Sequence, residues 1–431
     1  MTRHRLSLLA VLLCPLLMGA AADDPLAPPA GSDRAPRGIA LPGLNLPGPT
    51  RQQVEQLQRA GIGGDAAALF TLGELAGKAG NASAAFDAMR RAADQHCHPA
   101  EGALAEMLYR GFGTDPDAPR AAIMARRSAD GGDAGGQQVL GWLFAIGAGV
   151  EQSWPDAVRW TSQAAAQGNA RAQADLGWIL LNRNDAPPEV DQAIAWYERA
   201  AGQDDAMAET QLGMIYMYAS GYRQPANIER AALLFRHAAQ QGDTLGEREL
   251  GLAYWTGSGI EHSDVDAVAW FTTASQQGDE RASLMLSNAY EAGRGVVQDR
   301  IQSWTWLLRA AEQGDALARI VVARAYAGST WGPRTDLTEA AKWFEAALEV
   351  SDPMPRYRPA ETSGAFPTML ALARFEFGSM VEFGQGTKKQ LARAWRLFEA
   401  AADAGNERAM NRIGFMYHNG VGVPEIGRAH V

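Results

Sequence analysis

Apolar and small residues recur along this chain in an arrangement that repeats about every 36 residues. Most copies carry a Leu-Gly pair, as at Leu140-Gly141 and Leu176-Gly177, and most place an aromatic residue three positions after that glycine. Residues i and i+3 share a helix face, so this pattern predicts a first helix whose glycine lets a neighbour approach closely. A large residue with Ala four positions later predicts a second helix, as at Trp160 and Ala164.

A single marker position ends each copy, and it is usually glycine. Gly132, Gly168, Gly242, Gly278, Gly314 and Gly405 occupy it, while His96 and Asp204 replace glycine in two copies. We expect the left-handed backbone conformation that ends a helix here, which Gly adopts freely and Asp or His adopts at some cost. A Gly-x-Gly loop joins the two helices of a copy. Such a pair cannot bury its apolar face alone, so the copies must stack.

These slots together resemble the Sel1-like repeat family, a relative of the tetratricopeptide repeat. The resemblance covers residues 51–423 in about nine repeats and implies an all-α fold, an α/α solenoid whose first helices line a concave face. It also implies a scaffold, because similar exported bacterial proteins assist polysaccharide secretion machinery, restrain sensor kinases or take part in host interaction.

The largest departure from the period is an insertion of 18 residues near 351–368, which shifts the next marker to Met369. It carries Arg356, Tyr357 and Arg358 among several prolines. Insertions in a solenoid project from one face and often bind partners, so these three residues are binding candidates. A tolerated surface loop is an equally good interpretation.

Both ends of the chain predict segments outside the solenoid. Residues 1–22 have the basic, apolar and small-residue regions of a signal peptide, with cleavage after Ala22. Residues 23–50 are rich in Pro and predict a disordered linker. The last residues, 424–431, can be encoded by a stretch resembling a sequencing adapter, so we expect a non-native tail of a truncated gene model.

Composition narrows the function. The net charge is −10, which argues against nucleic acid as a partner because phosphate binding needs a basic surface. After the leader, no stretch is long and apolar enough to predict a transmembrane segment. Together with the leader, this predicts a periplasmic or secreted protein.

Catalysis is weakly supported. The sequence has no Gly-x-Ser-x-Gly, no phosphate-binding Gly-Lys-Ser/Thr and no His-Glu-x-x-His motif. Asp94, His96, Cys97 and His98 are close enough in sequence to consider Zn²⁺, but a helix-terminal loop explains them better. We therefore expect no catalytic residue, no metal and no cofactor.

Two groups stand out among the twelve Trp residues. One group occupies the large-residue slot of the second helix, and we expect it to be core; its members are Trp160, Trp196, Trp270, Trp306 and Trp343. Trp142 and Trp178 instead follow the Leu-Gly pair, where other copies hold Met, Leu, Asn, Arg or Phe. Because this slot varies so much, we expect Trp142 and Trp178 to bind a partner through stacked aromatic rings. Trp255 and Arg324 are further candidates for partner binding. Extra packing between repeats is the alternative.

The leading hypothesis is a non-catalytic periplasmic scaffold for envelope proteins. Two alternatives stay open. Cysteine-rich relatives of the family imply a β-lactamase-like or penicillin-binding enzyme, although only Cys97 follows the leader here. Aromatic and acidic side chains in a groove would also suit a cell-wall glycan, which predicts association with peptidoglycan.

Overall fold

A computed structural model describes residues 51–218, 226–328, 334–349 and 365–422 of the chain. The predicted leader, linker and C-terminal tail lie outside these residues, as do Arg356, Tyr357 and Arg358. The described part contains helices and no strand, as the repeat pattern predicts. It divides into two compact units that meet in sequence between Ile215 and Tyr216, and each is described separately.

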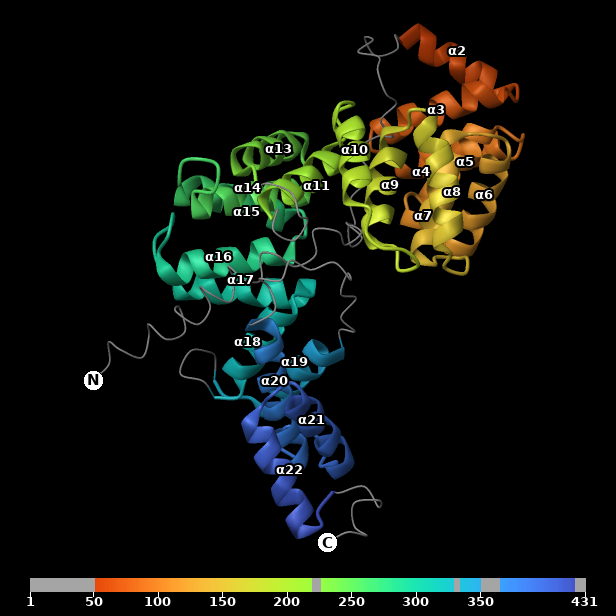
Figure 1. Ribbon diagram of the computed structural model, residues 1–431. Coiled ribbons are helices and arrows are strands. Elements are labelled where there is room, and N and C mark those ends of the chain that lie inside the picture. Colours follow the sequence, from red (N-terminus) through yellow and green to blue (C-terminus); the bar gives the residue numbers. More distant parts are fainter. Residues whose placement is uncertain (1–50, 219–225, 329–333, 350–364, 423–431) are drawn as a thin grey trace. The chain divides into compact units, whose positions relative to one another are not determined.

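The N-terminal unit is built from helices that pack against their neighbours in sequence (Figure 1). Its helices are α2 (Arg51–Ile62), α3 (Ala66–Lys78), α4 (Ala82–Ala93), α5 (His98–Arg110), α6 (Ala118–Asp130), α7 (Ala134–Ile146), α8 (Trp154–Ala166), α9 (Ala170–Asn182), α10 (Val190–Ala201) and most of α11 (Ala206–Met217). Helices α3, α5, α7, α9 and α11 are the first helices of their repeats. Successive first helices also touch, α5 against α7 and α7 against α9.

The C-terminal unit follows the same plan. Its helices are α13 (Ile228–Gln241), α14 (Thr244–Thr256), α15 (Asp264–Gln276), α16 (Glu280–Ala292), α17 (Arg300–Gln313), α18 (Ala316–Tyr326), α19 (Leu337–Glu349), α20 (Ala365–Phe383), α21 (Leu391–Asp403) and α22 (Glu407–Asn419). The first helices are α14, α16, α18, α20 and α22. No helix of the described residues is both long and apolar enough to cross a membrane.

Local chemistry sets the helix boundaries. The marker residues have positive φ, and the two non-glycine markers, His96 and Asp204, both have φ of 60°, which confirms the expected left-handed position. The residue after the marker caps the next helix: the side chain of Asp133 accepts from the backbone N–H of Gly136, and Asn169 accepts from Ala172. Each cap satisfies a donor that the helix would otherwise leave unpaired.

The side chain of the second helix that fills the core lies one position later in the sequence than the predicted large-residue slot. The knob position, defined as the seventh residue before each marker, is almost completely buried in every described repeat. Its residues are Met89, Ala125, Thr161, Tyr197, Phe235, Phe271, Leu307, Phe344 and Phe398. The expectation that all the slot tryptophans are core is wrong for four of them, because Trp196, Trp270, Trp306 and Trp343 are only half-buried. Arginine side chains lie over several of these rings instead, including Arg199 over Trp196 at 4.4 Å.

The helical glycine of the Leu-Gly pair faces the knob position. A Cβ atom at Gly177 would lie 2.9 Å from the ring of Tyr197, and one at Gly251 would lie 2.7 Å from the ring of Phe271. The missing side chain is what allows the second helix to lie flat on the first. The prediction that this glycine serves close helix packing is therefore confirmed.

A polar ladder accompanies this apolar contact. Its rungs join residues 30 apart, and they are Gln137–Gln167, Gln173–Gln203, Glu247–Gln277 and Ser283–Gln313. Gln137 and Gln173 also donate to carbonyls at the end of the preceding second helix, those of Ala129 and Ala165. The ladder therefore gives buried amides partners inside the stack.

One expected boundary differs from the structure. Met369 was the expected marker, but it lies inside α20, which begins at Ala365 and so includes the last four residues of the predicted insertion. Pro367 is the third residue of this helix, a position where its missing N–H breaks no helical hydrogen bond.

Candidate interaction surface

The tenth residue after each marker is called here the variable position. It follows the helical glycine, or the Ala or Ser that replaces this glycine in some repeats. In the N-terminal unit it is Glu74, Glu106, Trp142, Trp178 or Met214, and in the C-terminal unit it is Leu252, Asn288, Arg324, Ser379 or Phe415. Its exposure changes as much as its chemistry, from fully buried Met214 to 53% exposed Phe415. The residue before it is Gly, Ala or Ser in every described repeat, so these side chains give each repeat a different surface.

Trp142 and Trp178 come together in the N-terminal unit. Their ring centres lie 5.2 Å apart with the planes tilted by 59°, so the rings touch but do not stack in parallel. The Trp142 Nε1–H donates to the hydroxyl of Tyr109 on α5 over 3.4 Å. The ring centre of Trp154, the first residue of α8, lies 6.3 Å from that of Trp178. The four residues form one aromatic cluster across three repeats.

Burial divides the roles within this cluster. Trp178 is only 9% exposed, whereas Trp142 is half-buried. The indole nitrogens of Trp154 and Trp178 have no hydrogen-bond partner among the described residues. Trp178 therefore serves mainly as packing between repeats, and Trp142 carries the part of the cluster that a partner could reach.

A buried carboxylate lies on the same first helices. Gln138 of α7 donates to Asp175 of α9 over 2.5 Å, and Arg171 lies 3.2 Å from the other oxygen of the same carboxyl group. Burial raises the pKa of Asp175 above its ordinary value, and the charge of Arg171 acts in the opposite direction. This contact fixes adjacent first helices relative to each other.

Trp255 lies in a different setting in the C-terminal unit. It is 7% exposed, and the guanidinium of Arg294 stacks on its ring at 3.6 Å from the ring centre. Arg294 sits in a Gly-x-Gly loop and also donates to both carboxylate oxygens of Asp264 and to the Trp255 carbonyl. Trp255, a predicted partner-binding residue, is therefore covered by Arg294 of the same unit.

Arg324 is a more accessible predicted residue of the C-terminal unit than Trp255. Its side chain is 38% exposed, and its Nε lies 3.1 Å from a carboxylate oxygen of Glu376 on α20. Burial raises the pKa of Glu376, while the charge and hydrogen bond of Arg324 lower it. The pair links two successive first helices, as Gln138 and Asp175 do.

A second aromatic site lies on α20 and α22 and was missed by the sequence reasoning. Phe383 is 59% exposed, and Phe415 is similarly open. The guanidinium of Arg412 lies 5.2 Å from the first ring and 4.8 Å from the second. Buried Glu382 holds that guanidinium through an ion pair. Exposed aromatic rings with a fixed Arg are typical of binding hot spots.

Two histidines of the segment that suggested Zn²⁺ contact charged side chains of the same repeat. His98 Nδ1 lies 3.0 Å from a carboxylate oxygen of Glu101, and Arg127 lies 2.5 Å from the other oxygen of that carboxylate. His96 Nδ1 lies 2.9 Å from Arg127. Glu101 is almost completely buried. The side chains around it therefore pair with one another at a helix end.

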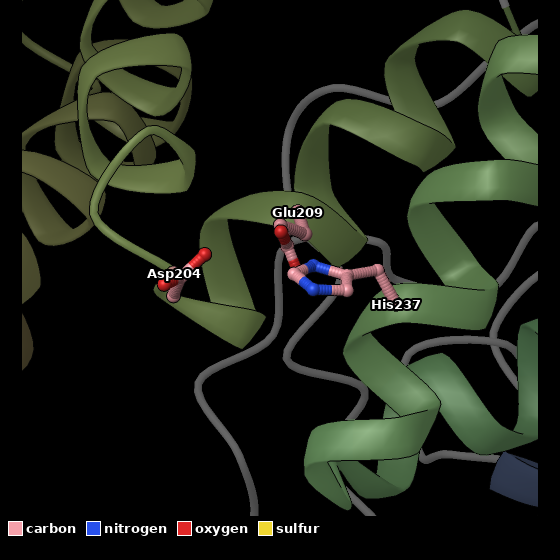
Figure 2. Close-up of side chains that lie close together, drawn as sticks. All are labelled: Asp204, Glu209 and His237. Atoms are coloured by element: carbon pink, nitrogen blue, oxygen red, sulfur yellow. The ribbon is translucent and has the colours of Figure 1, made fainter. Parts of the chain in front are cut away.

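Figure 2 shows three residues whose side chains include atoms suited to metal binding. Asp204 precedes α11 at a marker position, and Glu209 is buried within α11, so both belong to the N-terminal unit. His237 is exposed on α13 and belongs to the C-terminal unit. Because the three residues are divided between the two units, no metal site is derived from them.

The structure joins Trp142 to Trp178, and it places Trp255 and Arg324 in separate contacts. Tyr109 and Trp154 also belong to the aromatic cluster, although neither occupies a repeat position that marks it as a binding residue in the sequence. Phe415 could have been found, because it occupies the variable position of α22.

Solved structures with the same repeat resemble this chain. A Sel1 repeat protein from Oxalobacter formigenes is 30% identical, with 76% of this chain and 89% of that chain covered and a TM-score of 0.51. A protective antigen of uropathogenic Escherichia coli, described as displaying an SLR fold, is 27% identical, with coverages of 86% and 84% and a TM-score of 0.46. Among curated proteins, none matches this chain.

The Sel1 repeat family model matches the chain nine times. The matched residues are 98–133, 135–169, 170–205, 206–243, 245–279, 281–315, 316–351, 369–406 and 407–429. These segments make up more than half of the sequence, and they coincide with the helix pairs, the marker residues and the helical glycines described above. This chain belongs to the Sel1 repeat family.

Proposed function

We propose that this protein is a non-catalytic scaffold of the bacterial periplasm, which holds envelope proteins against the side chains of its first helices. Sel1 repeat proteins are generally protein-interaction scaffolds. The finer proposal rests on one observation. The variable position holds Trp142, Trp178 or Leu252 in three repeats whose preceding glycine packs against the knob position in the same way. A constant framework with changing surface residues is suited to recognising an extended protein surface.

The periplasmic part of the proposal rests on the sequence of residues 1–22. Its test is the mass of the mature protein in a periplasmic fraction. We expect the chain to begin at Asp23. Recovery of the uncleaved chain from the cytosol would contradict the location and leave the scaffold proposal to be tested separately.

Partner binding is tested by substituting Trp142 rather than Trp178. Truncation of buried Trp178 would leave a cavity that costs about 3–5 kcal/mol, so its loss would report on folding. Trp142→Ala changes a half-buried ring on a first helix, and Trp196→Ala is a matched control because it removes a half-buried ring from a second helix. Both variants are first compared with the parent chain by circular dichroism.

The experiment is quantitative crosslinking and affinity capture from envelope extract. We expect a specific protein that depends on Trp142 and is retained by Trp196→Ala. Equal capture by both variants would contradict the role of the aromatic cluster. Nitrocefin hydrolysis by the purified chain would favour the enzyme alternative, and sedimentation with peptidoglycan that needs Trp142 would favour the glycan alternative.

A further inference from the structure

Three exposed aliphatic side chains occur in the C-terminal unit where the loop before α17 meets the start of α15. Val265 is 67% exposed, Val297 is 87% exposed and Ile301 is 77% exposed. The loop lies directly on α15, because a Cβ atom at Gly295 would be 3.0 Å from the backbone nitrogen of Val265. Both second helices also pack against α16. The three side chains therefore lie on neighbouring backbone segments of two successive repeats, and we call them the aliphatic patch.

Other repeats carry different residues at the positions of the aliphatic patch. Where the loop before α17 has Val297, the other described Gly-x-Gly loops that join two helices of a repeat have Asp115, Glu151, Glu261 and Lys388. Among the described second helices, only α15 and α17 have Val or Ile as their second residue, and the rest have Ser, Pro, Asp, Glu, Thr or Ala. The fold therefore does not require aliphatic residues here. Single exposed aliphatic residues are common on protein surfaces, but a group of them marks an interaction surface.

A charged side chain flanks the aliphatic patch on each of the two helices. Arg300 precedes Ile301 on α17 and is 59% exposed, with its Nε 3.9 Å from a carboxylate oxygen of Glu291. Asp266 follows Val265 on α15 and is exposed as well. A basic residue therefore accompanies the aliphatic side chain of α17, and an acidic residue accompanies that of α15.

We propose that the aliphatic patch joins two copies of this chain in a symmetric dimer. In a twofold interface the same surface is used by both copies, so every contact occurs twice. Ile301 of one copy contacts Val265 of the other, and the same rotation brings Arg300 of one copy to Asp266 of the other. The aliphatic patch is thus complementary to itself in charge as well as in its apolar side chains.

Charge favours a second copy over a lipid surface as the occupant. Anionic membranes attract clusters of basic residues, whereas the exposed groups beside the aliphatic patch include two acidic residues, Glu261 and Asp266, and one basic residue, Arg300. Three side chains form a small contact, because standard interfaces bury about 800 Å² on each partner. We therefore expect a dimer that dissociates on dilution. The proposed scaffold surface lies on first helices, so the two proposals can fail independently.

Analytical ultracentrifugation of the purified chain over a range of concentrations tests the dimer. We expect a reversible equilibrium between monomer and dimer. Ile301→Asp should weaken dimerisation by at least about tenfold, because it places a charge in the apolar contact. Ile123→Asp is the matched control, since Ile123 is 57% exposed on second helix α6 of the N-terminal unit and should leave the equilibrium unchanged. Circular dichroism checks that both variants fold as the parent chain does.

Charge reversal tests the twofold arrangement itself. Arg300→Glu places an acidic residue opposite Asp266 of the other copy, and Asp266→Arg places a basic residue opposite Arg300. Each single variant should weaken dimerisation by about tenfold, because like charges then face each other. The double variant restores opposite charges at both contacts, so its dissociation constant should return to within about threefold of the parent value. A purely local effect on either helix would not be reversed in this way.

Three results would overturn the proposal. One is a chain that stays monomeric at about 0.2 mM, a concentration at which even weak interfaces of this size are populated. The second is a dimer that Ile301→Asp leaves intact, or that the double charge reversal fails to restore. The third is a monomer that binds phosphatidylglycerol vesicles in a flotation assay and loses this binding in Ile301→Asp, which would identify a lipid surface as the occupant.

Discussion

Helix α20 and helix α22 carry the same sequence slot and differ in what surrounds it. Phe377-Gly378 in α20 lies against Phe398 of α21, and both aromatic side chains are buried. Among the described residues, none lies within 4 Å of the Cβ position of Gly414 in α22, and Met410, Phe415 and Tyr417 are exposed. The repeat motif therefore encodes half of an interface, and the stability of each helix depends on whether the other half is present.

The largest expected effect comes from removing the knob residue that packs against Gly378. Phe398→Ala should destabilise the protein by about 3–5 kcal/mol, since the cavity would lie between two helices that cannot collapse onto each other. Phe415→Ala, an aromatic truncation on α22, should stay within about 0.5 kcal/mol because its ring is exposed. Urea denaturation followed by circular dichroism measures both. Equal losses would contradict the difference between the two helices.

The second expected effect comes from replacing the helical glycine of α20 or of α22 by Leu and comparing the change in stability. Gly378→Leu should cost about 3 kcal/mol, because a Cβ atom would already lie 2.8 Å from the Phe398 ring. Gly414→Leu should be neutral or slightly stabilising, since no described residue lies within 4 Å of its Cβ position and Leu is the better helix former. The same urea experiment tests this pair. A loss of stability in Gly414→Leu would show that the position is already covered.

The third expected effect measures what one hydrogen bond of the polar ladder contributes to stability. The ladder position that is Glu247 in α14 is Met410 in α22, so only the former has a rung. Gln277→Ala removes that rung and should cost about 1.5 kcal/mol. Gln276→Ala is the matched control, because the neighbouring side chain is exposed on the same helix. If the two substitutions had the same effect on the urea midpoint, the ladder would contribute no net stability.

The smallest expected effect concerns pH. Glu376 on α20 corresponds to Arg412 on α22, and burial raises its pKa above the ordinary 4.5. The protonated form is therefore favoured by folding, so this contribution is fully present below pH 4.5 and is lost as pH rises through the raised pKa. Glu376→Gln should flatten the urea midpoint over that window relative to the parent chain.

A control of opposite sign is available in Asp185. The hydrogen bond from Arg183 lowers the pKa of this carboxyl group from 3.8. Its contribution is present above pH 3.8 and is lost as pH falls through the lowered pKa. Asp185→Asn should therefore flatten the profile on the acid side. A Glu376→Gln profile parallel to that of the parent would contradict the assigned shift.

The sequence predicted the fold well because its strongest signals are backbone signals. Gly168 ends a helix in the left-handed conformation, and Asp204 adopts the same conformation, as a marker position requires. The knob position was assigned one residue too early. Trp270 and Phe271 are both large and apolar, and helical periodicity does not separate neighbours i and i+1 when both are apolar.

The candidate surface was harder to predict because it depends on contacts between repeats. Trp154 lies at a helix start outside the compared slot, and stacking brings it to Trp178. Arg294 covers Trp255 from a loop 39 residues later in the chain. The sequence does show a Gln directly before several markers. Its hydrogen bond to a residue 30 positions earlier is seen only in the three-dimensional structure.

The ladder has a consequence for how such a protein can change its length. Each rung joins a residue to one 30 positions later within the same helix pair, as Gln137 and Gln167 show. Duplicating or deleting one complete repeat by recombination would leave every remaining rung with a partner of the same kind. Adding one or two residues inside a helix would separate a buried amide from its partner. Genes for this architecture can therefore gain or lose whole repeats more easily than single codons.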